Sequence, residues 1–322
     1  MLKPQSKMRL VIQIPCFNEE KNIADTLNAI PAKIDGVDEV IKLIIDDGST
    51  DQTCEIAQQN GANFILKLRQ NMGLAKAFQA GIDESLKLGA DIIVNTDGDN
   101  QYNADDIKYL IEPIIKEGSE FVVGCRPIKN HPEFSKPKIL LQLLGSWFLR
   151  RISKTNIPDA ASGFRAYSRE TCLKMNIYSS FSHCMETLIQ AGTSGTKVNW
   201  VNIRVNPKTR NSRLFRSIPQ YIFKSAQTII YMSSVYSPGR FFGFLGASSL
   251  LPALCLALRF LILEASGLRE PGTNIPSLIL FSVFTITGLL FFSLAIIGEL
   301  LRSHRKLNEE ILYKLKKINM SK

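Results

Sequence analysis

The sequence lacks the cysteine pairs that mark a zinc site or a disulfide scaffold. Its six cysteines are scattered, with no C-x-x-C pair, at Cys16, Cys54, Cys125, Cys172, Cys184 and Cys255. This usage is typical of a reducing compartment, in which cysteines serve as small core residues. The first apolar stretch, Leu10–Pro15, is also too short for the ~7–15-residue core of a signal peptide. We therefore expect the chain to start in the cytosol, with this stretch as a first strand.

Fingerprints of two common nucleotide-binding folds are missing too. No G-x-G-x-x-G follows the first expected strand and no G-x-x-x-x-G-K-S/T occurs, so neither a dinucleotide-binding turn nor a P-loop is available. A hydrophobic content of 45% and an aromatic content of 9% exclude a disordered chain. The 322 residues suffice for one or two domains, and the net charge of +10 favours anionic partners without choosing among them.

Two long uncharged stretches near the C-terminus indicate a membrane protein. Phe241–Leu258 has no charged residue, and after Arg259 the apolar run resumes to Leu263; Ile275–Gly298 is a second uncharged run. As helices, both are long enough to cross a hydrocarbon core of ~30 Å. We expect two spans, at about 241–263 and 275–299; buried helices of a soluble protein are the alternative.

Charge predicts the orientation of these spans. Acidic residues are absent between Glu186 and Glu264, whereas basic residues are frequent there and again after the second span. The positive-inside rule places both the N-terminal domain and the tail in the cytoplasm, in a multi-pass protein of the cell (inner) membrane. We assign the basic excess to anionic lipid headgroups and expect no nucleic-acid partner.

The N-terminal part alternates strand-like and helix-like segments. Apolar runs typical of strands lie at Leu10–Ile14, Val40–Ile45, Phe64–Leu68, Asp91–Asn95 and Glu120–Val123, and helical periodicity marks Glu20–Ile30, Gly73–Leu88 and Ala104–Lys116. This order predicts an α/β fold with a mostly parallel sheet covered on both faces by helices. The expected organisation is an N-terminal domain at 1–215, a juxtamembrane interfacial segment at 216–239, a two-helix hairpin at 240–301 and a basic tail at 302–322.

Acidic segments follow three of these strands, at the edge where ligands of such sheets bind. They are Pro15–Glu20, Asp46–Asp51 and Asp97–Gln101. Helix capping accounts for acids such as Glu20 and Asp51. Asp97 and Asp99 precede the next helix by several residues, and their negative charges would repel each other. A divalent cation that shares phosphate oxygens resolves this conflict.

The three segments, P-C-F-N-E-E, I-D-D-G-S-T-D and D-G-D-N-Q, resemble the family 2 glycosyltransferases of GT-A fold. Ser162–Arg165 and the two spans resemble, more narrowly, the polyprenyl-phosphate glycosyltransferases, the group containing dolichol-phosphate mannose synthase. The resemblance covers residues 8–215, and the tail in architecture only. It implies a Rossmann-like GT-A domain, a nucleotide diphosphate sugar donor, a polyprenyl (undecaprenyl or dolichyl) phosphate acceptor, and Mg²⁺ or Mn²⁺. It is compatible with homo-oligomers and does not identify the sugar.

The resemblance also implies roles for residues of the first two segments. Pro15, Phe17 and Glu19 would line the base and ribose pocket, with Phe17 where the family often has Tyr. Asp47 would accept hydrogen bonds from the nucleoside. Its neighbour Asp46 is a less certain member of the same pocket.

The third segment and a later arginine would hold the diphosphate. By the resemblance, Asp97 and Gly98 contact the nucleotide sugar, with Asp97 at the ribose or at a metal-bound water. Asp99 and Gln101 would hold the Mg²⁺ or Mn²⁺. Arg126 matches a family arginine that binds phosphate.

Cations near the end of the N-terminal domain would bind the acceptor phosphate. The family's Gly-x-Ser-Lys sequence is replaced here by a segment without the glycine, in which Ser212 and Arg213 match the Ser-Lys pair. Arg210, or else Lys208, would supply the remaining cation. Arg165 is a further candidate for the acceptor phosphate. A basic cluster that touches only lipid is the alternative for each residue of this segment.

The carboxylates that could act as a general base help to distinguish an alcohol acceptor from a phosphate acceptor. An alcohol acceptor needs a base near the anomeric carbon, and after residue 120 no Glu-Asp pair occurs where inverting GT-A enzymes usually have one, although Asp159 and Glu186 remain candidates. A phosphate acceptor is already ionised and needs cations instead, which Arg126, Arg210 and Arg213 could supply. We therefore expect an inverting, metal-dependent transfer of one sugar to a lipid phosphate.

Two apolar segments could bring a lipid acceptor to this site. Pro137–Arg151 resembles an interfacial helix, with a buried helix as an equal alternative, and Ile218–Met232 could lie along the membrane surface. The competing functions are a processive polysaccharide or lipid-head-group synthase and a non-catalytic membrane protein that binds sugar nucleotides. The Q-x-x-R-W segment of processive synthases is absent from this sequence. The intact acidic segments weigh against a non-catalytic protein.

Overall fold

The computed structural model describes residues 7–128, 136–178, 183–207, 218–267 and 274–320. The chain forms two compact units, one of Met1–Ser225 with Glu310–Lys322 and the other of Ala226–Glu309. We call them the sheet unit and the hairpin unit. The sheet unit thus includes the end of the chain, and the expected domain boundaries at 215 and 302 stay a prediction.

A mostly parallel sheet forms the centre of the sheet unit. Within the described residues it has seven strands in the order β3-β2-β1-β4-β6-β5-β7. All neighbours run parallel except β6, which is antiparallel to both β4 and β5. The strands are β1 (Arg9–Cys16), β2 (Glu39–Asp46), β3 (Phe64–Lys67), β4 (Ile92–Asn95), β5 (Phe121–Cys125), β6 (Arg165–Ser168) and β7 (Val198–Asn202). The predicted α/β architecture is confirmed, and the five expected strands correspond to β1 through β5.

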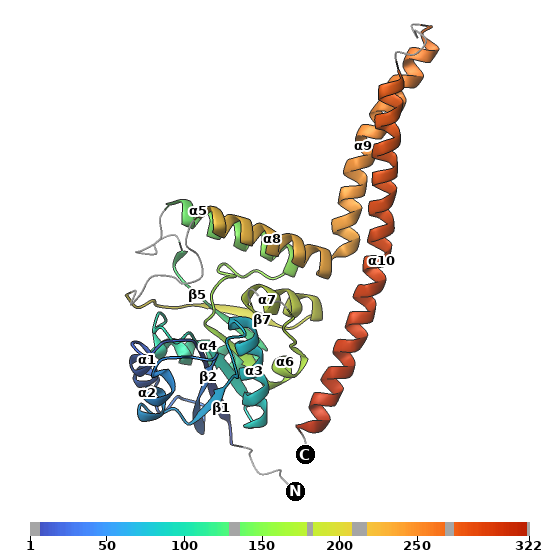
Figure 1. Ribbon diagram of the computed structural model, residues 1–322. Helices are drawn as coiled ribbons and strands as arrows, with labels where there is room; N and C mark the ends of the chain where they lie inside the picture. The colour runs from blue at the N-terminus through green and yellow to red at the C-terminus, as the bar shows by residue number, and fades with distance from the viewer. Residues whose placement is uncertain (1–6, 129–135, 179–182, 208–217, 268–273, 321–322) are drawn as a thin grey trace. The chain divides into compact units, whose positions relative to one another are not determined.

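Helices flank this sheet (Figure 1). They cover it because its strands carry buried apolar side chains on both faces. On one face, Leu10, Ile12 and Ile14 of β1 belong to a core shared with α1 and α4. On the other, α3 packs against β1 and β2, where a Cβ added at Gly81 would lie only 2.5 Å from the side chain of Gln13. The helices are α1 (Ile23–Ala29), α2 (Thr53–Gln59), α3 (Leu74–Lys87), η1 (Ala104–Asp106), α4 (Ile107–Glu117), α6 (Arg169–Lys174) and α7 (His183–Ser194).

Helix α5 (Lys136–Ser153) has an unusual distribution of side chains. The polar residues Gln142 and Ser146 are buried, and their side chains bond to the segment around Asp159. Leu140, Leu144 and Trp147 recur at i, i+4 and i+7 and are each more than half exposed. The helix therefore turns its polar face inward and an apolar stripe outward, the reverse of an ordinary surface helix.

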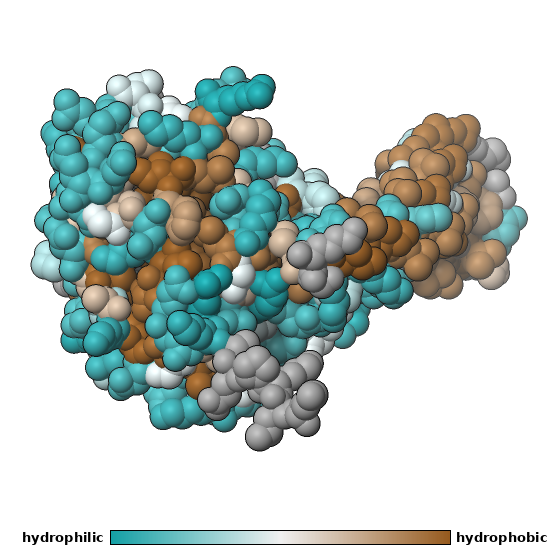
Figure 2. Space-filling view, turned by 90° about the horizontal axis from the view of Figure 1, so that it is seen from below, coloured by the Kyte–Doolittle hydropathy of each residue, from teal (hydrophilic) through white to brown (hydrophobic). Residues whose placement is uncertain are grey.

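The hairpin unit contains most of two long helices, α9 (Pro238–Ala265) and α10 (Ile275–Asn319). Each is long and apolar enough to cross a membrane, by length and composition. The two helices pack closely at Gly246. A Cβ added there would lie 3.0 Å from the Phe292 ring and 3.1 Å from the Gly288 carbonyl oxygen, so glycine permits this close approach. The hairpin is predominantly hydrophobic on the surface seen in Figure 2.

Two helices cross the border between the units. Helix α8 (Ile218–Tyr236) begins in the sheet unit, within the expected juxtamembrane segment, and ends in the hairpin unit. Helix α10 continues without a break through most of the expected tail and ends at Asn319 in the sheet unit. The sheet unit and the hairpin unit are therefore joined by two helical segments of the chain.

Candidate active site

The three acidic segments meet at one edge of the sheet. Strand β1 pairs with β2 on one side and with β4 on the other, all parallel, so their carboxyl ends are neighbours. The loops that follow are bonded together: the Asp47 N–H donates to the Cys16 carbonyl (2.9 Å), and the Thr26 hydroxyl donates to the Gly98 carbonyl (3.2 Å). The structure thus brings together the segments that the sequence assigned to the donor.

The residues expected to line a base and ribose pocket lie at the end of β1 and in the loop that follows it. Pro15 is a buried residue of that strand, whereas the Phe17 side chain is 37% exposed. Glu19 is buried, and its carboxylate accepts a hydrogen bond from the Asn22 amide (3.0 Å). The Glu19 N–H donates to the Thr53 hydroxyl (2.8 Å), which ties this loop to the start of α2.

Asp46 and Asp47 hold the backbone around them. Asp46 accepts the Ser49 N–H (3.0 Å). The two carboxylate oxygens of Asp47 accept the N–H groups of Met72 (2.8 Å) and Gly73 (2.9 Å), at the start of α3. Both aspartates are nearly fully buried, so each has a structural role besides any contact with a nucleoside.

Gly48 explains why the turn after these aspartates has the sequence D-D-G. Its φ of +76° lies in the left-handed region, which strongly favours glycine. A Cβ there would also lie 2.7 Å from the backbone nitrogen of Asn71. A larger residue would therefore push the segment held by Asp47 out of place.

Asp97 and Asp99 form a strained pair of like charges. Burial, followed by the negative charge of Asp99, raises the pKa of Asp97 to about 7. The Asp99 carboxylate accepts the Gln101 N–H (3.3 Å), and the Gln101 carbonyl accepts the Asn206 N–H (2.9 Å). This pair fits a divalent cation, since a positive ion would relieve the repulsion that raises the pKa.

Protein ligands alone do not complete a metal shell at this pair. Within the described ranges, no group of three or more His, Cys, Asp or Glu side chains could hold a metal ion. A cation at Asp97 and Asp99 would therefore need further oxygens, such as those of a diphosphate, the amide oxygen of Gln101 or water.

Gly163 lies close to the Asp97 carboxylate. A Cβ at Gly163 would lie 3.3 Å from a carboxylate oxygen of Asp97, so glycine leaves room for that group. The Gly163 N–H donates to the Tyr102 hydroxyl (3.1 Å), and its carbonyl accepts the Asn95 amide (2.9 Å). The sequence drew attention to the segment Ser162–Arg165 but not to this role of Gly163, Tyr102 and Asn95.

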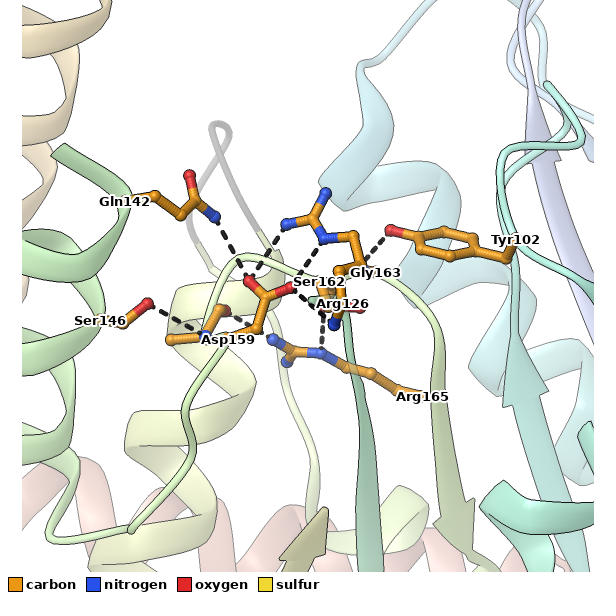
Figure 3. Close-up of polar contacts among 9 residues, drawn as sticks. Tyr102, Arg126, Gln142, Ser146, Asp159, Ser162, Gly163 and Arg165 are labelled. Atoms are coloured by element: carbon orange, nitrogen blue, oxygen red, sulfur yellow. Dashed lines mark hydrogen bonds and ion pairs between the residues drawn. The ribbon is translucent and has the colours of Figure 1, made fainter. Parts of the chain in front are cut away.

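Arg126 makes a buried ion pair with Asp159 (Figure 3). Nε and Nη2 of Arg126 donate to the two Asp159 oxygens at 2.7 and 3.1 Å, and Gln142 of α5 donates to the same carboxylate at 3.3 Å. Burial works against both charges, but Arg126 holds the pKa of Asp159 below its usual value, and Asp159 with other neighbours raises the pKa of Arg126. Asp159 is therefore an anionic partner of Arg126 and a poor candidate for the general base.

Glu186, the other candidate base, is also engaged. It is buried, and its carboxylate accepts the Tyr178 N–H at 3.1 and 3.2 Å. Its neighbour Gln190 donates to the same carboxylate at 3.4 Å. Glu186 thus stabilises the connection between α6 and α7.

The structure speaks against Arg165 as a contact of the acceptor phosphate. The side chain is fully buried, and its N–H groups donate to the carbonyls of Ser162, Cys184 and Ala160 and to the Thr187 hydroxyl, at 2.6–2.8 Å. Figure 3 shows Arg165 beside Ser162. A phosphate would have to displace these bonds. Arg165 instead fixes the loop that carries Gly163 to the start of α7.

The remaining predicted phosphate ligands, Arg210, Ser212 and Arg213, lie outside the described residues, as does the alternative Lys208.

Comparison with known proteins finds glycosyltransferases. Residues 11–174 match the family described as glycosyl transferase family 2. The chain is 32% identical over 213 residues to a UDP-N-acetylglucosamine–dolichyl-phosphate N-acetylglucosaminyltransferase of Methanococcus voltae, covering 59% of this chain and 83% of the relative. It is 23% identical over 318 residues to the dodecaprenyl-phosphate galacturonate synthase of Rhizobium johnstonii, covering 92% and 89%.

Solved structures support the fold assignment. A crystal structure of glucosyl-3-phosphoglycerate synthase from Mycobacterium tuberculosis, in complex with Mn²⁺, UDP and phosphoglyceric acid, matches with a TM-score of 0.56 at 21% identity. The match covers 72% of this chain and 79% of that one. At this identity the likeness establishes the GT-A type of fold.

Proposed function

Because the chain belongs to glycosyltransferase family 2, we propose that it transfers one sugar, with inversion, from a nucleotide diphosphate donor to a polyprenyl phosphate. Relatives named for dolichyl-phosphate and dodecaprenyl-phosphate chemistry support the acceptor class. The observation that carries the proposal is the state of Asp159. One of the two carboxylates that the sequence offers as a base, Asp159, is bound to Arg126 instead.

The donor would bind at the edge formed by β1, β2 and β4. Phe17 is partly exposed there and could stack on the base, while Asp46 and Asp47 fix the loops around the nucleoside. Asp97, Asp99 and Gln101 would hold Mg²⁺ or Mn²⁺, which offsets negative charge on the leaving diphosphate. A structure of the same fold contains Mn²⁺ and UDP, which supports this choice of cation and ligand.

The acceptor would approach Arg126. A phosphate monoester is largely ionised near neutral pH, so its oxygen can attack the anomeric carbon without a protein base. It does need positive charge to overcome repulsion from the donor diphosphate. Arg126 is held in place by Asp159 and Gln142 and could provide that charge. Arg210 and Arg213 are proposed to add to it.

Helix α5 would bring the site to the lipid. Its exposed apolar stripe of Leu140, Leu144 and Trp147 fits the boundary between headgroups and acyl chains. The buried side of the same helix carries Gln142, which bonds to Asp159. One helix would thus contact the membrane on one face and support the phosphate-binding arginine on the other. The basic residues flanking the two apolar helices favour the cytoplasmic leaflet.

A transfer assay with the full-length protein tests this function. We would incubate it in vesicles containing undecaprenyl phosphate with a panel of radiolabelled nucleotide sugars, with and without EDTA, and analyse the lipid product. We expect one sugar on the lipid phosphate, with activity lost in EDTA and restored by Mg²⁺ or Mn²⁺. Transfer of several sugars would indicate a processive synthase, and undiminished activity in EDTA would refute the metal assignment.

A matched pair of variants makes the metal test specific. Asp99→Ala should lower transfer by at least ~100-fold, since loss of an electrostatic contact to developing charge typically costs that much. Asp25→Ala removes a carboxylate from an exposed position on α1 and should leave transfer unchanged. Equal activity of the two variants would rule out a role for Asp99 at the diphosphate.

A further inference from the structure

The C-terminal end of α10 belongs to the sheet unit although the chain has by then passed through the hairpin unit. The covalent connection between the units is therefore made twice, once through α8 and once through α10. At the first connection the chain runs on directly from the sheet unit. At the second, side chains of residues 310–319 contact α3, α6 and the Met175 carbonyl oxygen of that unit.

Those contacts join basic and aromatic residues of α10 to acidic residues of α3 and α6. The Tyr313 hydroxyl donates to the Glu170 carboxylate. The Lys316 ammonium lies 3.3 Å from an Asp83 carboxylate oxygen and 3.3 Å from the Met175 carbonyl oxygen. Lys317 lies 3.9 Å from Glu170 and donates to the Tyr313 hydroxyl at 2.9 Å.

The attachment is polar rather than apolar. Tyr313 and Lys316 are partly buried, whereas the apolar residues Ile311, Leu315 and Ile318 of the same helix are each more than half exposed. The ion pairs are also partly exposed to water, so each is individually weak and sensitive to salt. A set of weak charged contacts can be released and remade, unlike a buried apolar interface.

We propose that residues Glu310–Asn319 act as an electrostatic brace, a second and reversible attachment that holds the sheet unit for reaction with an acceptor embedded in lipid. This inference rests on the proposed lipid phosphate acceptor for its functional part. The brace holds α3 and α6, two helices packed on the central sheet, so it restrains the whole catalytic domain. Tyr313, Lys316 and Lys317 are positioning residues, since none of them belongs to the site itself.

The consequence is a split between two kinds of acceptor. A short-chain, water-soluble polyprenyl phosphate diffuses to the site, so its use does not depend on how the sheet unit is held. A long-chain acceptor in the bilayer is reached only when the site faces the membrane correctly. Loss of the brace should therefore raise KM for the long-chain acceptor and leave KM for the short one and for the donor unchanged.

The first test measures the attachment itself and needs no activity. Hydrogen exchange of full-length protein in lipid nanodiscs would compare Lys316→Glu with Lys314→Glu, which changes the same charge on an exposed position paired with Glu310. We expect Lys316→Glu to speed exchange of residues 310–319 by roughly fivefold, as expected for loss of a weak ion pair, and Lys314→Glu to leave it near the wild-type rate. Equal exchange in both variants would overturn the proposal.

The second test asks whether the attachment matters for the acceptor. The reciprocal variant Asp83→Lys with Lys316→Glu restores opposite charges across the contact, so it should recover both slow exchange and the wild-type KM for the long-chain acceptor. If exchange changes but neither KM does, the positioning role is refuted. If wild-type protein transfers sugar to neither acceptor, the proposed function fails, while the exchange data still decide whether the brace exists.

Discussion

The ion pair of Arg126 and Asp159 should be a large contributor to the stability of the sheet unit. The Asp159 side chain is fully buried and that of Arg126 is 10% exposed, so neither charge can be rehydrated in place. Removing one partner of a buried pair typically costs ~3–5 kcal/mol, because the other charge is left uncompensated. For a domain of this size, Asp159→Ala should lower the unfolding temperature by roughly 6–20 °C.

The cysteines of the protein provide the assay. Five of the six are buried and belong to the sheet unit, whereas Cys255 of α9 is exposed and would give a constant background. A thiol-reactive dye followed during heating therefore reports unfolding of the unit that contains the pair. Because Arg126 lowers the pKa of Asp159, the stabilisation is present above the unfolded-state pKa of ~3.9 and is lost only as the pH falls through the folded-state value. The measurement belongs at pH 7.

A double variant separates stability from function. Arg126→Met with Asp159→Leu removes both charges, and it should recover much of the unfolding temperature lost in Asp159→Ala. It should still be inactive, because the cation proposed for the acceptor phosphate is gone. A drop below about 3 °C for Asp159→Ala would refute the reasoning, since the buried charge would then cost under ~1.5 kcal/mol. The reasoning would also be refuted if the double variant unfolded at the same temperature as Asp159→Ala or at a lower one.

Three further predictions concern other parts of the sheet unit. Gly163→Ala should reduce transfer about tenfold, or ~1.4 kcal/mol, because the added methyl group crowds Asp97. Gly145→Ala is the control and should leave transfer unchanged, since an added methyl group there meets nothing within 4 Å. Equal activities of the two variants would contradict this prediction. Burial and then Arg165 lower the pKa of His183 to about 3. The free energy of unfolding should therefore fall by up to ~1.4 kcal/mol per pH unit below pH ~6.5. In His183→Gln, thermal unfolding at pH 7 and pH 5 should show a smaller dependence of stability on pH. An unchanged dependence would exclude His183 as the cause. Trp147 fluorescence should be quenched by brominated lipids in a Trp200→Phe background, since the sequence has only 2 tryptophans; an unquenched Trp147 would mean that α5 does not lie at the membrane.

The donor side of the site was predictable from the sequence because its signals are local. Strands β1, β2 and β4 are apolar runs, and each leads directly into the polar segment that lines the edge. The parallel order then requires those segments to meet. The turn at Gly48 follows the same logic, since its positive φ depends on glycine at that position.

The acceptor side was less predictable because its contacts connect distant residues. Arg126 and Asp159 are 33 positions apart, and nothing in the sequence indicates that they pair. Strand β6, Arg165–Ser168, is only four residues long and begins with a charged residue, so it has no apolar run to mark it. Arg165 was interpreted as a candidate phosphate contact because the segment Ser162–Arg165 resembles one that lies near the acceptor side in the family, whereas burial makes it a cross-link between loops.

The contacts of the C-terminal end of α10 were also not predictable from the sequence. The basic residues after the second apolar run were interpreted as a basic cytoplasmic tail, from their charge. Their helical phase is what matters, because it turns Tyr313 and Lys316 toward α3 and α6. Periodicity could have predicted a helix there, but not the acidic partners, which lie more than 140 positions earlier in the sequence.

The reversed direction of β6 has a consequence for how this enzyme could diversify. The chain leaves the reactive edge at the end of β5 and comes back to that same edge at the start of β6, so α5 and Asp159 belong to one continuous segment between these two points, and α5 packs against α7 outside that segment. Grafting residues 126–164 from a relative would therefore replace the recipient-facing half of the enzyme in a single block. Strands β1, β2 and β4 lie outside that block and would keep their register, and Gly163, which lies beside Asp97, is the position of the block that the donor side would need unchanged.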